Sequence, residues 1–171
     1  TGIENDDEES RPIKVHEISN GFLEYIDNFE NNRIYFGITP LDKNLPLTGG
    51  SVVGVIGSAG SGKTSLALNL LANTSKNGVM SVCASLDMSR NRFFEKILYR
   101  QFNKSREQTF KDFKEQQDMI RAEVQKEFGN VYIFDRSSPS VESIREYVMD
   151  VEQSTGEKVK LLAIDYFERI S

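Results

Sequence analysis

The chain has 171 residues and a formal net charge of −5 at neutral pH, with 38% hydrophobic and 27% charged residues. This length accommodates one domain with a substantial core, and the composition is typical of a soluble globular protein. The acidic balance argues against a wholly basic protein that coats nucleic acid, and no apolar run approaches the roughly 20 residues that a membrane span needs.

Two segments precede the main body of the sequence. Residues 1–12 are mainly polar and rich in acidic residues, so we expect them to be disordered. Because the chain starts with threonine, we expect it to be a piece of a longer protein. A helix is expected over residues 13–30, interrupted by Asn20-Gly21, because apolar side chains recur there at steps of three and four. Two interpretations remain open for this helix: it packs on its own domain, or it is a linker that docks on a neighbouring subunit.

Residues 31–171 alternate between short apolar runs and segments with helical periodicity. Strands are expected at residues 51–56, 79–86, 131–134 and 160–165. Helices are expected at residues 63–76, 90–102 and 107–128, and after Ser138-Pro139-Ser140. This alternation predicts an α/β domain with a mainly parallel sheet flanked by helices and right-handed crossovers. The first apolar run is predicted to be a strand buried on both faces of that sheet.

A phosphate-binding loop follows this first run. The pattern G-x-x-x-x-G-K-[ST] is matched in full by Gly57, Ser58, Ala59, Gly60, Ser61, Gly62, Lys63 and Thr64, and Ser65 continues the helix that follows. Glycines let successive backbone N–H groups curl around a phosphate, and the helix N-terminus adds partial positive charge. We expect these residues to bind ATP with Mg²⁺, with Lys63 between the β- and γ-phosphates and Thr64 on the metal. The alternative is a glycine-rich turn with an exposed lysine, which the strand-loop-helix context disfavours.

Two aspartates follow apolar strands and are candidates for the same site. Asp165 ends the last predicted strand, where a Walker B carboxylate would hold Mg²⁺ through water. It could instead merely terminate a strand. Asp87 ends the second strand, where a carboxylate could orient or deprotonate the attacking water, so Lys63 and Asp87 are the candidate catalytic residues. For Asp87 the alternative is a cap on the next helix, which its sequence position by itself favours.

The histidine, the cysteine and the basic stretch of this sequence do not indicate a second functional site. His16 and Cys83 are the sole histidine and cysteine, so no His/Cys metal cluster is expected, no internal disulfide can form, and a reducing compartment is favoured. We expect Cys83 to be a small buried hydrophobic residue within its strand. The basic stretch from Arg90 to Lys114 is predicted to be a solvated helical face, because it also contains the acidic residues Glu95, Glu107, Asp112 and Glu115.

The motifs, in this order, resemble the ATPase domain of DnaB-type replicative helicases, within the RecA-like ATPases, from about Gly37 to Ile170. The phosphate loop is shared by many families. More specific are one segment similar to the family's Ser-Leu-Glu-Met-Ser signature and another similar to its Ile-Asp-Tyr-Leu Walker B segment. The segments that carry the resemblance are Gly37-Ile38-Thr39-Pro40-Leu41-Asp42, Leu47-Thr48-Gly49-Gly50, Ser85-Leu86-Asp87-Met88-Ser89, Tyr132-Ile133-Phe134-Asp135 and Ile164-Asp165-Tyr166-Phe167.

The resemblance implies a RecA-like fold and roles for individual residues. Lys63 and Thr64 would bind phosphate and Mg²⁺, and Asp165 would be the Walker B acid. Asp87 takes the position of the family's catalytic glutamate. Aspartate is one methylene shorter, so its carboxylate would lie about 1 Å farther from the water, and such a misplacement can lower a rate on the order of 10²-fold.

The resemblance also implies partners and an incomplete domain. It implies a homo-oligomer that forms a hexameric ring, and single-stranded DNA bound by the full-length protein. A primase or helicase loader would be a further partner. The location would be the cytoplasm of a bacterium or of a phage-infected host, with no membrane partner. The sequence stops just after Walker B, before the family's sensor strand, DNA-binding loops and arginine finger, so we expect residues 31–171 to be part of the core. Alternatives are a RecA- or KaiC-like ATPase switch or assembly factor, and an inactive nucleotide-binding module.

Overall fold

A computed structural model of the protein describes residues 12–136 and 139–165. The segment expected to be disordered, residues 1–12, lies outside this part except for Pro12. Ser138 and the residues that follow Asp165 lie outside it as well. The chain divides into two compact units, Thr1–Arg33 and Ile34–Ser171, which are described separately.

The first unit contains two short helices where one was predicted. A 3₁₀ helix, η1, spans Val15–Asn20, and the α-helix α1 spans Phe22–Asn31. Gly21 lies between them with φ −101° and ψ 0°, outside helical geometry, so the interruption expected at Asn20-Gly21 divides the helix in two. The apolar side chains of this unit are largely exposed, among them Val15, Ile18, Phe22, Leu23, Tyr25 and Ile26.

The second unit is built on a three-stranded parallel sheet. Its strands are β1 (Ser81–Ser85), β2 (Val131–Phe134) and β3 (Leu161–Asp165), in the order β2-β1-β3. Ser85 is in register with Asp165, so the carboxyl ends of β1 and β3 lie side by side. The predicted parallel sheet is therefore confirmed, with its second, third and fourth expected strands in place.

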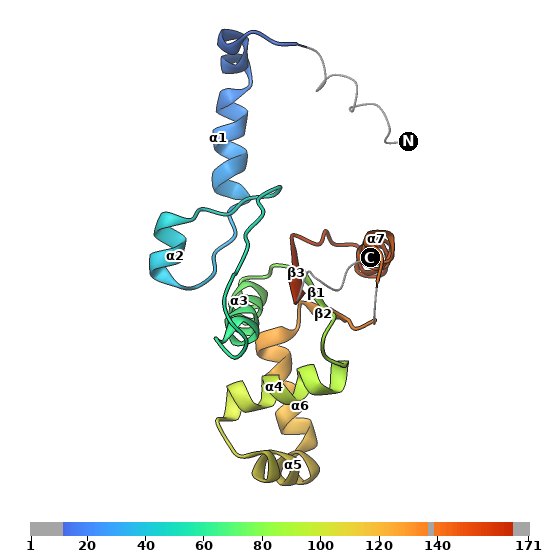
Figure 1. The fold of residues 1–171 in the computed structure, drawn as a ribbon. Coiled ribbons are helices and arrows are strands. Elements are labelled where there is room, and N and C mark those ends of the chain that lie inside the picture. The colour runs from blue at the N-terminus through green and yellow to red at the C-terminus, as the bar shows by residue number, and fades with distance from the viewer. Residues whose placement is uncertain (1–11, 137–138, 166–171) are drawn as a thin grey trace. The chain divides into compact units, whose positions relative to one another are not determined.

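Helices cover both faces of the sheet (Figure 1). Successive residues of β1 point to opposite faces, as the two-residue period of a strand requires. Cys83 packs in a core with α3 (Lys63–Lys76), α4 (Arg90–Phe102) and α6 (Gln117–Phe128). Val82 and Ala84 pack in a second core with α7 (Val141–Thr155) on the other face. Because both faces are buried, β1 is apolar or small at every position.

The helix predicted over residues 107–128 is two helices. It forms α5 (Arg106–Glu115) and α6, which meet at Gln116 with φ −133° and ψ 38°. The half-buried Phe113 of α5 lies edge-on against Phe94 of α4 at 5.8 Å between ring centroids, while Phe128 of α6 enters the core. The two helices thus pack on different neighbours.

The prediction of a buried strand at residues 51–56 is wrong for this structure. The segment has no strand conformation, and Val52 and Ile56 are 97% and 99% exposed. A strand forms only when a neighbour receives its backbone N–H and C=O groups. Within residues 12–136 and 139–165, the only partner that β3 has is β1, and no strand pairs with the apolar run.

The chain enters the second unit through a small satellite core that packs on α3. Ile34 forms an antiparallel bridge with Leu47, on either side of the short helix α2 (Thr39–Asn44). Gly37 has φ +73°, and a Cβ on it would lie 2.6 Å from the Asn73 side chain, which itself donates to the Phe36 carbonyl at 2.7 Å. Glycine is therefore required where this segment crosses α3.

In the part of the chain that the structure describes, no helix is long and apolar enough to cross a membrane.

Candidate nucleotide-binding site

The loop of residues 57–64 leads directly into α3. Gly60 and Gly62 have φ +77° and +94°, in the left-handed region that favours glycine, and Gly62 is the N-cap of α3. A Cβ on Gly57 would lie 2.6 Å from Ser61 Oγ, so the curl of the loop leaves no room for a side chain there. The loop therefore folds back on itself in front of a helix N-terminus, whose first backbone N–H groups have no acceptor within the helix.

Lys63 places its ammonium group within this loop. Its Nζ donates to the carbonyl oxygens of Gly57 at 2.7 Å and Ser58 at 2.9 Å. The positive charge is thus held at the start of the loop by two neutral acceptors, which a phosphate oxygen can replace with a charge-assisted hydrogen bond.

Thr64 and Asp165 meet although 101 positions separate them in the sequence. Thr64 Oγ1 donates to Asp165 Oδ2 at 2.8 Å, in a partly buried position. Hydroxyl and carboxylate oxygens are hard ligands of the kind that Mg²⁺ prefers. No group of three or more His, Cys, Asp or Glu side chains that could hold a metal exists among the residues described, so Mg²⁺ here would need phosphate oxygens and water as its remaining ligands.

The loop that carries Asp87 lies beside Asp165. The backbone N–H of Leu86 donates to the Asp165 carbonyl at 2.8 Å, and Ser85 Oγ donates to the Met88 carbonyl at 3.0 Å. Asp87 is exposed in this loop. The N-cap of α4 is Ser89, whose Oγ accepts from the Arg92 backbone N–H at 3.5 Å. The alternative that Asp87 caps this helix is therefore wrong.

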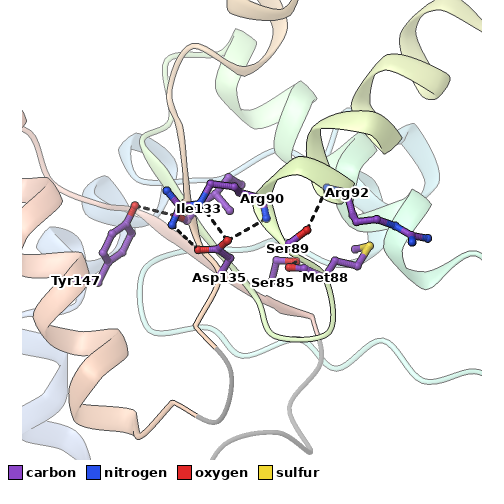
Figure 2. A network of polar contacts seen from close by, with 8 residues as sticks. All are labelled: Ser85, Met88, Ser89, Arg90, Arg92, Ile133, Asp135 and Tyr147. Carbon is purple, nitrogen blue, oxygen red and sulfur yellow. Dashed lines mark hydrogen bonds and ion pairs between the residues drawn. The ribbon is translucent and has the colours of Figure 1, made fainter. Parts of the chain in front are cut away.

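A polar cluster at the same end of the sheet was not anticipated from the sequence (Figure 2). The Asp135 carboxylate, just after β2, accepts three hydrogen bonds from Arg90, the first residue of α4. Close by, Tyr147 on α7 donates its hydroxyl to the Ile133 carbonyl at 2.9 Å. Asp135 directly follows the four apolar residues of β2, and this position is the signal that could have singled it out.

Cys83 and the basic stretch from Arg90 to Lys114 have the structural environments that were expected for them. Burial raises the pKa of the Cys83 thiol to about 12, as expected for a small buried residue within a strand. Two basic residues of the stretch from Arg90 to Lys114 pair with acidic ones: Arg106 with Glu95 at 2.8 Å, and Lys104, between α4 and α5, with Asp112 at 2.6 Å. These pairs are the balance that a solvated helical face requires.

A parallel sheet with helices on both faces, a glycine loop that opens a helix, and an acidic strand end bonded to that helix are the features of the P-loop class of proteins. Residues 34–171 match the family model of the DnaB-like helicase C terminal domain. This match covers most of the chain, so the chain belongs to that family. The fold class and the helicase ATPase resemblance predicted from the sequence are confirmed.

The solved structures that share the fold include two that cover most of this chain. One is described as a DnaB-like replicative helicase and its interactions with primase; it has a TM-score of 0.73 and 21% identity, over 94% of this chain and 40% of that chain. The other is the ATPase domain of G40P, with a TM-score of 0.62 and 19% identity, over 94% of this chain and 60% of that chain. This chain therefore spans less than two thirds of either structure. A search of curated proteins finds no match.

Proposed function

We propose that this chain is part of the ATP-hydrolysing motor of a DnaB-like replicative DNA helicase. The observation that carries the proposal is the hydrogen bond between Thr64 and Asp165, because it joins the phosphate loop to an acidic strand end of the kind that holds Mg²⁺. ATP would bind along residues 57–65, with its phosphates against the backbone N–H groups at the start of α3.

Each side chain of the site has a distinct role in this proposal. Lys63 would leave the carbonyls of Gly57 and Ser58 and neutralise the β- and γ-phosphates. Thr64 would ligate Mg²⁺ directly, and Asp165 would orient it through water. Mg²⁺, when bound, would supply positive charge that offsets the negative charge of the phosphates.

Asp87 is the proposed group that orients or deprotonates the attacking water. Its loop is bonded to the end of β3 through Leu86, which places it at the same edge of the sheet as Asp165. An aspartate in place of the family's glutamate favours slow hydrolysis. This substitution is also the observation that favours the second candidate function, a nucleotide-binding module without turnover.

The proposal extends to the assembly. The exposed apolar side chains of η1 and α1, including Phe22, Tyr25 and Ile26, have the character of a surface that a neighbouring subunit covers, as expected for the linker of a hexameric ring. The solved DnaB-like helicase was described with primase, and we extend a primase or loader partner to this protein. Single-stranded DNA would be the track, and the protein would act in the cytoplasm of a bacterium or of a phage-infected host.

The deciding experiment measures ATP turnover by the natural protein that carries this chain, with and without single-stranded DNA, beside an assay of strand separation. Turnover that DNA stimulates, together with unwinding, is the expected result. Nucleotide-dependent assembly without unwinding would instead support a RecA- or KaiC-like switch. Tight ATP binding without turnover would support the inert module. The Asp87→Asn variant is the matched control, since it should bind ATP normally and hydrolyse it more slowly.

A further inference from the structure

The ion pair between Arg90 and Asp135 has a geometry that few surface pairs reach. Arg90 donates from Nε to Asp135 Oδ2 at 3.0 Å and from its terminal Nη2 to Oδ1 at 2.7 Å, so both carboxylate oxygens are engaged. The backbone N–H of Arg90 adds a third hydrogen bond to Oδ2 at 3.0 Å. A two-pronged contact of this kind fixes the relative orientation of the two groups as well as their distance.

The pair joins the start of α4 to the end of β2, as Figure 2 shows. Asp135 is well shielded, with 14% of its side chain exposed, and the hydrogen bonds from Arg90 lower the pKa of its carboxyl group. The carboxylate is therefore charged at neutral pH and also offsets the partial positive charge of the α4 N-terminus. Asp135 thus holds the first residue of α4 through its backbone and its side chain together.

This contact restrains one end of the loop that contains Asp87. At the other end, Leu86 is bonded to Asp165 of β3, and Ser85 closes the loop through the Met88 carbonyl. Residues 86–89 are thus held between two strands, by the β1–β3 ladder on one side and by the Arg90–Asp135 pair on the other. If either anchor moves, the position of the Asp87 side chain relative to Asp165 must change.

We infer that Arg90 and Asp135 are positioning residues, which act through the loop to place the Asp87 carboxylate for ATP hydrolysis. The inference rests on the proposed function. The 74% exposure of the Arg90 side chain limits what the pair contributes to folding stability, although its two-pronged geometry and the shielded Asp135 carboxylate retain part of that contribution. Position, by contrast, matters greatly for a carboxylate that is already one methylene shorter than the family's glutamate.

The first test separates turnover from binding in the natural protein. Arg90→Ala and Asp135→Asn should each lower kcat by about tenfold or more, since a displacement of about 1 Å can lower a rate by 10². The dissociation constant for ATP should stay unchanged, and the melting temperature should fall by no more than about 2–4 °C, the shift that corresponds to about 1 kcal/mol in a domain of this size. Arg90→Lys should recover only part of the loss, because an ammonium group cannot form the two-pronged contact. Arg92→Ala, on the same first turn of α4, is the matched control and should behave like the wild type.

The second test asks whether the effect passes through Asp87. In an Asp87→Asn background, Arg90→Ala should produce no further loss of kcat, whereas a general structural effect would multiply with the first loss. A multiplied loss, or unchanged kcat in both single variants, would overturn the inference and leave the proposed function intact. Unchanged turnover in Asp87→Asn alone would remove the catalytic role of Asp87 and the inference with it. If Arg90→Ala does not fold, Arg90→Lys and Asp135→Asn provide the same comparison.

Discussion

Replacing Lys63 with alanine tests the phosphate loop most directly. The Lys63 ammonium already donates two hydrogen bonds, of 2.7 and 2.9 Å, to carbonyls of its own loop. ATP binding would exchange them for bonds to phosphate oxygens. Hydrogen bonds to charged groups contribute about 1.5–3 kcal/mol each, so removing one net interaction should weaken ATP binding by roughly 10- to 150-fold.

Calorimetric titration of the natural protein with ATP, ADP and AMP, in the presence of Mg²⁺, measures this effect. The loss should be large for ATP and ADP and absent for AMP, because AMP lacks the phosphates that Lys63 is proposed to contact. Lys76→Ala is the matched control: it removes the same charge from the opposite end of α3, where Lys76 pairs with Glu127 at 2.6 Å. Equal ATP affinity in the wild type and Lys63→Ala would refute the loop assignment, and an equal loss in Lys76→Ala would reduce it to an effect of net charge.

Three further substitutions probe the site and the core. Asp165→Asn keeps an oxygen acceptor for Thr64 but removes the charge, so the gain in ATP affinity that Mg²⁺ provides should shrink in titrations with and without a chelator. Asp87→Glu should raise kcat if the shorter side chain limits hydrolysis; a lower kcat would show that the loop is built around aspartate. Leu71→Ala, at a side chain that is 1% exposed in the core between α3 and the sheet, should lower the free energy of unfolding by about 2–5 kcal/mol, as measured by denaturant titration.

The parts of the fold that depend on local pattern were predictable. The helices α3 and α4 begin and end at the predicted residues, because capping residues and apolar periodicity are properties of the segment itself. β2 was likewise predicted to the residue. The break at Gln116 was not predicted, since the helical pattern of the sequence continues across it.

The run at residues 51–56 shows that local pattern alone does not determine whether a strand forms. Its apolar composition is that of a buried strand, but composition cannot supply a partner for its backbone groups, and in this structure the run is exposed. Whether such a run becomes a strand depends on a neighbour that comes from elsewhere in the chain.

The sequence by itself determined the chemistry of this protein: the glycines and Lys63 of the phosphate loop, the hydroxyl of Thr64, and the acidic ends of the apolar runs. Those are properties of residue type and short spacing, which the chain carries before it folds. Only the tertiary structure decided which carboxylates meet which partners. It joined Thr64 to Asp165 and brought Asp135 to Arg90. Such pairings depend on the order and register of parallel strands, which arise from contacts between segments far apart in the sequence.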